Sequence, residues 1–237
     1  MDVHSISTKC TRTEFVGTAV LDTIGLVISG VDDTLLKERK IVFEDNGAPL
    51  WYKTIKVLEL FAGTRSIGKA FEAKGHEVYS IEWNKDFENI DLYADIGKIT
   101  AQDILDKFGH PDVIWASPDC TTFSIAAISH HRKKNAETGN LDPVSDYAKF
   151  CDETDQHVIS LIKELKPTYY FIENPRGGMR KMSWIQELPR YTVTYCQYGD
   201  MRMKPTDIWT NHPNPKFLPM CKNGDSCHVS APRGSKT

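Results

Sequence analysis

Short apolar segments alternate with longer segments of helical spacing along most of this 237-residue chain. A run of apolar residues fits a buried strand, whereas apolar residues three and four positions apart mark one face of a helix. The predicted strands are Ile55–Leu60, Glu77–Ile81, Asn89–Ala94, Asp112–Ala116, Thr168–Ile172, Thr192–Cys196 and Asp207–Trp209. The predicted helices are Ser66–Lys74, Ala101–Phe108 and Asp146–Leu165. This alternation predicts an α/β fold with a mostly parallel sheet and helices on both faces.

The same pattern divides the chain into three parts. We predict an N-terminal extension at 1–52, a main domain at 53–210 and a basic, Pro-rich tail at 211–237. Within the extension, Val16–Val20 and Leu26–Ser29 resemble short strands, and residues 45–49 resemble a turn. The polar segment Ile125–Val144 predicts a long loop. From residue 201 to the end, six Lys or Arg stand against two Asp, so the tail is a candidate recognition element.

Composition restricts the class of protein. A hydrophobic share of 40% is enough for a core, and the length suits one substantial domain with a small appendage. The net charge of −3 excludes an overall basic field, so nucleic-acid binding needs local positive patches. Six scattered cysteines form no dense disulfide framework and fit reduced thiols in a cytoplasmic protein. We expect no signal peptide and no membrane span, because Asp22 and several Gly and Thr interrupt the longest apolar tract.

One pair of residues predicts a nucleotide-type cofactor. Gly63 lies in a tight turn between a predicted strand and helix, and Glu82 ends the next strand 19 positions later. A carboxylate there can accept hydrogen bonds from ribose hydroxyls. Trp83 could cover an adenine ring, and Asp95 could bind an exocyclic amine. A lone glycine turn is common, however, and Glu82 could equally be a solvated strand end. The sparse glycine pattern argues against a dinucleotide.

A second group of polar residues follows three later strands. Cys120 lies in the turn Ser117-Pro118-Asp119-Cys120-Thr121-Thr122-Phe123-Ser124, Glu173 ends the next strand, and Arg202 follows another. Adjacent parallel strands would bring these residues to the edge where α/β sheets bind ligands. Taken singly, Cys120 fits a small buried hydrophobe, Glu173 a strand-end ion pair and Arg202 a surface arginine. Together they predict a nucleophilic thiol accompanied by an acid and a cation.

Five segments, in this order, resemble the motifs of the DNA cytosine-5 methyltransferase family, particularly its small phage-type members. They are Leu58–Gly63, Ile81–Trp83, Ala94–Ile96, Ser117–Ser124 and Glu173–Pro175. The resemblance spans about residues 55–210 and implies a Rossmann-like fold that depends on S-adenosylmethionine. It implies transfer of a methyl group to C5 of cytosine in double-stranded DNA, as in restriction–modification. If a phage encodes the chain, the enzyme would act in the cytoplasm of a bacterial host.

The resemblance also implies roles for individual residues. The cofactor contacts would be Phe61, Ala62, Gly63, Thr64, Glu82, Trp83, Asp95, Ile96 and Pro118. Cys120 would add to C6 of the base, a protonated Glu173 would hold N3, and Arg202 would hold the base carbonyl or a phosphate. We therefore expect burial that raises the pKa of Glu173.

A target base must leave the duplex to reach the thiol. The segment 125–139 is placed to close over Cys120, and its basic run could contact phosphates. The predicted DNA contacts are Ser124, His131, Arg132, Lys133 and Lys204. The same run is equally compatible with a solvated loop.

Departures from the family pattern leave alternatives open. Asp119 replaces a proline and puts a negative charge beside the thiol, which suits a slow enzyme or a silent DNA-binding relative. Arg65 could pair with an acidic group on a modified donor, and RNA or a free nucleotide could replace DNA. A zinc site could use Cys196, Cys221, Cys227 and His228. Because adjacent Cys and His rarely bind one ion, we predict no metal.

Overall fold

The computed structural model describes residues 39–43 and 49–229, with side chains from residue 54 onward. The strands predicted at Val16–Val20 and Leu26–Ser29 lie outside these residues. β1 (Arg39–Phe43) and β2 (Pro49–Lys53) pair antiparallel, so the chain reverses direction between them. The domain boundary expected at residue 53 falls at the end of β2 and stays a prediction.

Seven strands form the main sheet, in the order β10–β11–β9–β6–β3–β4–β5. Their bounds are β3 (Lys56–Leu60), β4 (Glu77–Glu82), β5 (Leu92–Tyr93), β6 (Val113–Ala116), β9 (Tyr169–Pro175), β10 (Arg190–Thr194) and β11 (Pro205–Thr210). The strands from β9 to β5 in this order are parallel to one another. β11 runs antiparallel between β9 and β10. The Rossmann-like fold with a mostly parallel sheet is therefore confirmed.

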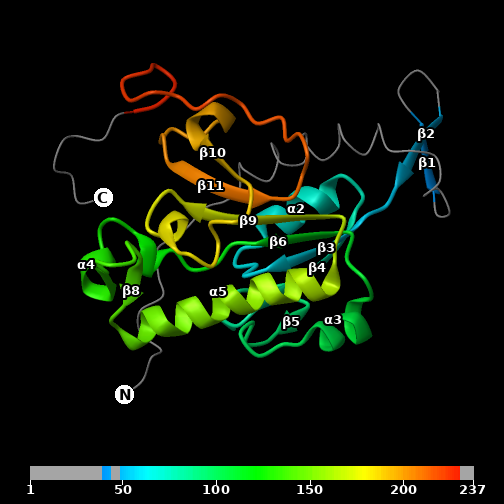
Figure 1. Cartoon of the computed structure of the whole chain (residues 1–237). Coiled ribbons are helices and arrows are strands. Elements are labelled where there is room, and N and C mark those ends of the chain that lie inside the picture. The colour runs from blue at the N-terminus through cyan, green and yellow to red at the C-terminus, as the bar shows by residue number, and fades with distance from the viewer. Residues whose placement is uncertain (1–38, 44–48, 230–237) are drawn as a thin grey trace.

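Helices cover both faces of this sheet. They are α2 (Ser66–Ala73), α3 (Ala101–Phe108) and α5 (Asp146–Leu165). Successive strand residues point to opposite faces. Leu58 accordingly packs in a core with α3 and α5, whereas Val57 packs in a second core with Phe71 of α2. Figure 1 shows α3 and α5 together below the sheet and α2 above it.

The bounds of α3 and α5 agree with the predicted ones because local signals set them. At the start of α3, the Thr100 hydroxyl accepts the Asp103 N–H, and the Asp103 carboxylate accepts the Thr100 N–H. The Ser145 hydroxyl accepts an N–H from the first turn of α5. Lys166, in the left-handed conformation, ends that helix.

The prediction of a long loop at Ile125–Val144 is wrong. The chain after β6 forms η3 (Thr121–Phe123), α4 (Ile128–His131), β7 (Arg132–Lys134) and β8 (Leu141–Pro143). β7 and β8 pair as an antiparallel hairpin. These elements are three or four residues long and largely polar, so no hydrophobic period marks them in the sequence. Two further short 3₁₀ helices are η4 (Met179–Lys181) and η5 (Tyr195–Tyr198).

Candidate active site

Three segments meet at the carboxyl edge of the sheet, close to β3. In the sheet, β4 lies on one side of β3 and β6 lies on the other, so the strand order reverses here. β3 continues into the turn at 61–65, and β6 continues into the segment that contains Cys120. β9 carries Glu173 near its end. Leu60, Ala116 and Ile172 lie in register across the three strands. Open α/β sheets bind their ligands at such a switch point.

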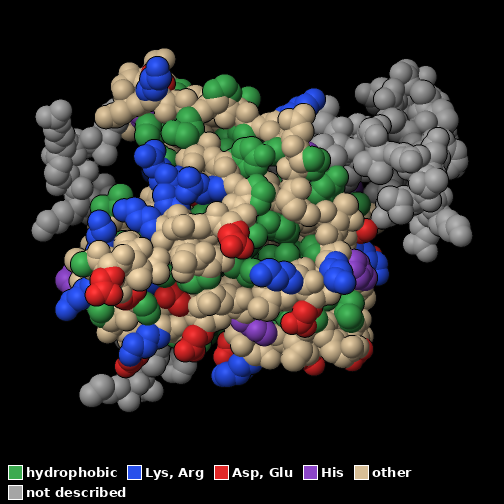
Figure 2. All heavy atoms as spheres, viewed as in Figure 1, with side chains coloured by type: hydrophobic (Ala, Val, Ile, Leu, Met, Phe, Trp, Pro, Cys, Tyr) green, Lys and Arg blue, Asp and Glu red, His purple; other side chains and the backbone are tan. Residues whose placement is uncertain are grey.

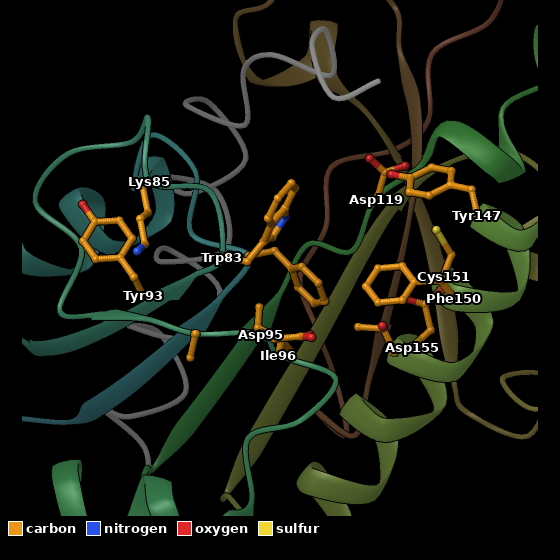
Figure 3. Close-up of a pocket in the computed structure, with 13 residues that line it drawn as sticks. Trp83, Lys85, Tyr93, Asp95, Ile96, Asp119, Tyr147, Phe150, Cys151 and Asp155 are labelled. Carbon is orange, nitrogen blue, oxygen red and sulfur yellow. The ribbon is translucent and has the colours of Figure 1, made fainter. Parts of the chain in front are cut away.

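A cavity of about 540 Å³ opens at this edge. Its volume lies within the range of roughly 300–1,000 Å³ that is usual for small-molecule sites. It is lined by Phe61, Trp83, Lys85, Tyr93, Ala94, Asp95, Ile96, Asp119, Tyr147, Phe150, Cys151, Thr154 and Asp155. Figure 3 shows Trp83, Asp95 and Ile96 on one side, facing residues of α5 and the Cys120 segment across the gap. The cavity therefore connects the turns after β4 and β5 with the segment that holds the thiol.

Glu82 supports the turn after β3 and is not part of the cavity lining. Its Oε2 accepts the Gly63 N–H at 3.0 Å, and its Oε1 accepts the N–H groups of Trp83 and Asn84, each at 2.9 Å. Gly63 has a φ of 50°, a conformation that glycine adopts without strain. The spacing of 19 residues between Gly63 and Glu82 thus reflects a direct hydrogen bond between them.

The wall that α5 contributes was not found by sequence reasoning. Tyr147, Cys151 and Thr154 lie four and three positions apart on α5, so they share one face of the helix. Asp155 is buried, and its Oδ2 has no hydrogen-bond partner. Burial, followed by the nearby Asp152 carboxylate, raises the pKa of Asp155 well above its usual value. The spacing of polar residues on the apolar face of α5 could have revealed this wall.

Asp119 faces the cavity beside Tyr147 (Figure 3). Its Oδ1 accepts the Thr121 N–H at 2.6 Å and so holds the turn around the partly exposed Cys120. Burial raises the pKa of Cys151 to about 12, and the charges of Asp155 and Asp119 add to that effect. The suggested influence of Asp119 on Cys120 itself stays a prediction.

Two hydrogen bonds tie β9 to its surroundings at this edge. The Asn174 Nδ2 donates to the Pro118 carbonyl at 3.1 Å, which fixes the segment before Cys120. The Tyr195 hydroxyl donates to Oε1 of the buried Glu173 at 3.0 Å. Burial raises the pKa of Glu173, although the charge of Lys204 and the Tyr195 bond work in the opposite direction. The raised pKa of Glu173 agrees with the prediction.

Comparison with known proteins decides the family. Residues 55–183 match the family described as C-5 cytosine-specific DNA methylases. The chain is also 31% identical, over 182 residues, to a protein of Frog virus 3 (isolate Goorha) described as a probable DNA (cytosine-5)-methyltransferase. That alignment covers 73% of this chain and 78% of the viral protein. The chain belongs to the C-5 cytosine-specific DNA methylase family. It is a DNA cytosine-5 methyltransferase that uses S-adenosylmethionine.

Solved structures of methyltransferases resemble this methylase in fold alone. One is described as a prophage-encoded DNA modification methyltransferase from E. coli, with a TM-score of 0.49 and 19% identity. The match covers 66% of this chain and 46% of the E. coli chain, so this chain spans less than half of that protein's length. Another is magnesium protoporphyrin IX methyltransferase from Synechocystis PCC 6803, with a TM-score of 0.42 and 9% identity, covering 86% and 85% of the two chains.

The cavity of the methylase suits S-adenosylmethionine. Phe61 and Trp83 offer aromatic surface, and Trp83 is 48% exposed at the rim. Asp119 puts a carboxyl group on the other wall, where a cationic sulfonium or amino group would be favoured. Asp155 puts a second carboxyl group there, and its raised pKa favours the protonated form. The unpartnered Oδ2 of Asp155 can accept a hydrogen bond from a ligand.

The nine predicted cofactor residues therefore separate into two groups. Phe61, Trp83, Asp95 and Ile96 line the cavity. Ala62, Gly63, Thr64, Glu82 and Pro118 belong to the turns around it and are not among its lining residues. Asp95 already accepts the Gly97 N–H at 3.0 Å and pairs with Lys98 at 2.8 Å. All nine roles stay predictions.

The prediction that Arg132 contacts DNA is wrong. Its side chain is fully buried and binds the Asp152 carboxylate through two nitrogens, at 2.7 and 3.0 Å. It also donates to the Thr122 carbonyl at 3.1 Å and lies 4.0 Å from the centre of the Phe123 ring. Arg132 therefore fastens η3, the turn after Cys120, to α5. The next residue, Lys133, is exposed.

The modified-donor role suggested for Arg65 has no support in the structure. Arg65 is buried, forms an ion pair with Glu72 of α2, the helix that it precedes, and is not among the cavity residues. His131 is partly buried, and its Nδ1 lies 2.8 Å from the Ser145 hydroxyl. DNA contacts by His131, Ser124, Lys133 and Lys204 stay predictions.

Arg202 and Lys204 reach the active-site edge by a different route from the expected one. β11 lies antiparallel between β9 and β10, so the turn joining β10 to β11 carries both residues to the edge. Arg202 is exposed and binds Asp200, with one contact at 2.9 Å. Lys204 lies 4.5 Å from the centre of the Tyr195 ring. Because its charge lowers the pKa of Glu173, Lys204 is the cation that acts on the buried acid.

The structure brings together the four residues that sequence reasoning weighed as zinc ligands. Cys196, Cys221, Cys227 and His228, here called the Cys₃His cluster, have ligand atoms within 4.8 Å of one another. The prediction of no metal rested on the adjacency of Cys227 and His228, and this geometry removes that argument. Among the described residues, none of the helices has the length and apolar character needed to span a bilayer.

Proposed function

We propose that this methyltransferase acts on double-stranded DNA through a covalent bond between the Cys120 thiol and C6 of a cytosine turned out of the helix. C5 of cytosine is a weak nucleophile, and addition of a thiolate to C6 makes it an enamine carbon. S-adenosylmethionine supplies the electrophilic methyl group. Loss of the C5 proton then returns electrons to the ring and breaks the bond between sulfur and C6.

Glu173 would supply the proton or hydrogen bond that N3 needs during this addition. A carboxyl group can donate only when it is protonated, and burial favours the protonated form of Glu173. The Tyr195 hydroxyl holds the opposite side of the group by donating to Oε1. The Ser117 side chain also hydrogen-bonds this carboxyl group, and both bonds oppose the effect of burial on its pKa.

The observation that carries the proposal is the link between β9 and the Cys120 segment. β6 and β9 are adjacent and parallel, with Ala116 opposite Ile172, so the two segments that follow leave the same edge side by side. The bond from Asn174 to the Pro118 carbonyl joins them two residues before the thiol and one residue after the acid. Residues that act at the same time on two atoms of one ring, here C6 and N3, require such fixed spacing.

Positive charge near this edge supports DNA as the substrate surface. Figure 2 shows Lys and Arg side chains gathered between β11 and the α4–β8 region. Lys133 and Lys134 of the hairpin are exposed, as is Ile125 beside the thiol segment, at 82%. Phosphate contacts from such lysines position a duplex without reading its sequence. A base inside that duplex is accessible to Cys120 only after it has been flipped out.

The test uses DNA in which 5-fluorocytosine replaces cytosine throughout, so that the target sequence need not be known. The fluorine at C5 cannot be removed by a base as the C5 proton is. The covalent complex therefore persists and can be seen on a denaturing gel. We expect the complex with wild type and with Cys10→Ser, but none with Cys120→Ala. A complex that forms equally with Cys120→Ala would refute the thiol's role. Equal trapping on single-stranded DNA would refute the requirement for a duplex.

A further inference from the structure

The Cys₃His cluster joins two parts of the chain that are distant in sequence. Cys196 lies in η5, directly after β10, and the other three residues lie in the tail at 211–229. Cys196 and Cys221 are buried, His228 is partly buried and Cys227 is exposed. The tail, orange to red in Figure 1, runs back above β10. The cluster therefore sits where the tail crosses the edge of the sheet.

The spacing of the ligand atoms fits one tetrahedral ion. With zinc bonds of about 2.3 Å to sulfur and about 2.0 Å to nitrogen, neighbouring ligand atoms in a tetrahedron are roughly 3.5–3.8 Å apart. The Cys227 sulfur lies 3.6 Å from the Cys196 sulfur and 3.5 Å from His228 Nδ1. The Cys221 sulfur lies 3.7 Å from His228 Nδ1 and 3.0 Å from the Cys196 sulfur. Of these four pairs, only the last must separate to admit the ion, and the other two pairs of ligand atoms lie within 4.8 Å of each other.

The adjacency of Cys227 and His228 is no obstacle in this fold. Neighbouring side chains point in opposite directions only in extended backbone. Residues 227–228 form no strand, and both side chains turn to the same point. The imidazole faces the cluster through Nδ1, the nitrogen nearer to the backbone. Because Nδ1 lies close to the backbone, the His228 imidazole can bind the same ion as the sulfur of the preceding Cys227.

We propose that Cys196, Cys221, Cys227 and His228 bind one structural zinc ion. Three thiolates and one imidazole fill all four positions of a tetrahedral site, which leaves none for water or substrate. The site would act by holding the tail to the domain and would take no part in methyl transfer. It is independent of the covalent mechanism proposed above, because it lies outside the cofactor cavity.

The ion would fix a segment that has little other structure. The described residues from 211 to 229 form neither helix nor strand. Two backbone bonds flank the cluster: the Cys221 N–H donates to the Thr194 hydroxyl at 3.0 Å, and the Val229 N–H donates to the Met201 carbonyl at 2.9 Å. Met201 belongs to the β10–β11 turn that also carries Lys204, so the zinc site would support that turn next to the active-site edge.

A disulfide between Cys196 and Cys221 is the competing explanation for two buried sulfurs 3.0 Å apart. A disulfide between these two cysteines would not explain why the Cys227 and His228 side chains point to the same place. The two explanations differ in thiol count. The chain has six cysteines, so a denatured, chelated, unreduced sample gives six reactive thiols for a zinc site and four for one disulfide.

The test measures metal in the full chain purified without chelator. By elemental mass spectrometry we expect about one zinc ion per wild-type chain. We expect the zinc content to be at least five-fold lower in Cys227→Ser and in Cys221→Ser. The matched control is Cys151→Ser, a buried thiol outside the cluster that should keep its zinc. Unchanged zinc in Cys227→Ser, or four thiols in wild type, would overturn the proposal.

A second measurement does not depend on variants that fold. Wild type stripped by chelator is titrated with Co²⁺, whose visible absorption reports thiolate ligands in a tetrahedral site. We expect absorption that saturates at one equivalent and disappears when Zn²⁺ is added. A titration without thiolate absorption would contradict the site even if purified protein contained zinc.

Discussion

The segment around the nucleophile and the C-terminal tail lie at neighbouring edges of the sheet but are held by different chemistry. The nucleophile segment, residues 117–145, is fastened by a buried ion pair between Arg132 and Asp152. In the tail, residues 211–229, the side chains of Cys221, Cys227 and His228 meet Cys196 in the Cys₃His cluster. Loss of a buried cation leaves its partner charge uncompensated, whereas loss of the proposed zinc ion leaves thiolates that can take up protons and become neutral. The nucleophile segment should therefore be coupled to the stability of the whole domain, and the tail should open by itself.

Substitution of Arg132 should have the largest effect. Arg132→Met leaves the Asp152 carboxylate buried without its partner, which costs about 3–5 kcal/mol of unfolding free energy. Lys133→Met, one residue later and exposed, should change that free energy by less than about 0.5 kcal/mol. Urea unfolding of both variants measures the difference. A cost for Arg132→Met as small as that of Lys133→Met would mean that the ion pair does not anchor the segment.

Substitution of Gly177 should have the second-largest effect. Gly177 follows β9 and lies against Phe123 of the nucleophile segment. An added Cβ would lie 2.5 Å from the Phe123 carbonyl oxygen, so backbone must move. We expect Gly177→Ala to cost about 1–3 kcal/mol and to slow trapping of 5-fluorocytosine DNA. Gly139→Ala is the control, since nothing lies within 4 Å of its added Cβ. Its φ of 74° costs strain alone, on the order of 1 kcal/mol. Equal trapping rates would show that Gly177 does not position the thiol.

Removal of metal should act on the tail and spare the core. With chelator, we expect trypsin to cut after Lys216 and Lys222, while the fragment that ends at Lys216 keeps its unfolding transition. Local opening of this kind needs less free energy than global unfolding. Electrophoresis of the digest with and without chelator measures it. Cutting that spreads through residues 117–145 would show that tail and nucleophile segment open together.

Lys204 should have the smallest effect on stability and should change the pH profile instead. Its positive charge favours the ionised form of Glu173 and so lowers the pKa of that carboxyl. Lys204→Met should raise that pKa, so the protonated acid persists to higher pH. The alkaline limb of kcat/KM should therefore move upward in pH, and Lys133→Met should leave it in place. A downward shift would contradict the assigned position of Lys204.

Local patterns predicted the elements that local forces determine. The bounds of α3 and α5 follow from capping residues and helical spacing, and the turn at Gly63 follows from its place between strand and helix. Arg132 was misassigned because its partner Asp152 lies 20 residues away, and sequence alone does not reveal which of two neighbouring cations turns inward. The convergence of Cys227 and His228 depends on a backbone path that no periodic pattern describes. Long-range contacts thus decide what local motifs leave open.

The central claim is that the Cys120 sulfur forms the bond to the target base. Trypsin should release residues 108–132 as one peptide, in which Cys120 is the single cysteine, whereas Cys151 falls in a different peptide. Mass spectrometry of the trapped and digested 5-fluorocytosine complex should place the nucleotide on peptide 108–132. A nucleotide on the Cys151 peptide, or on none, would contradict the account.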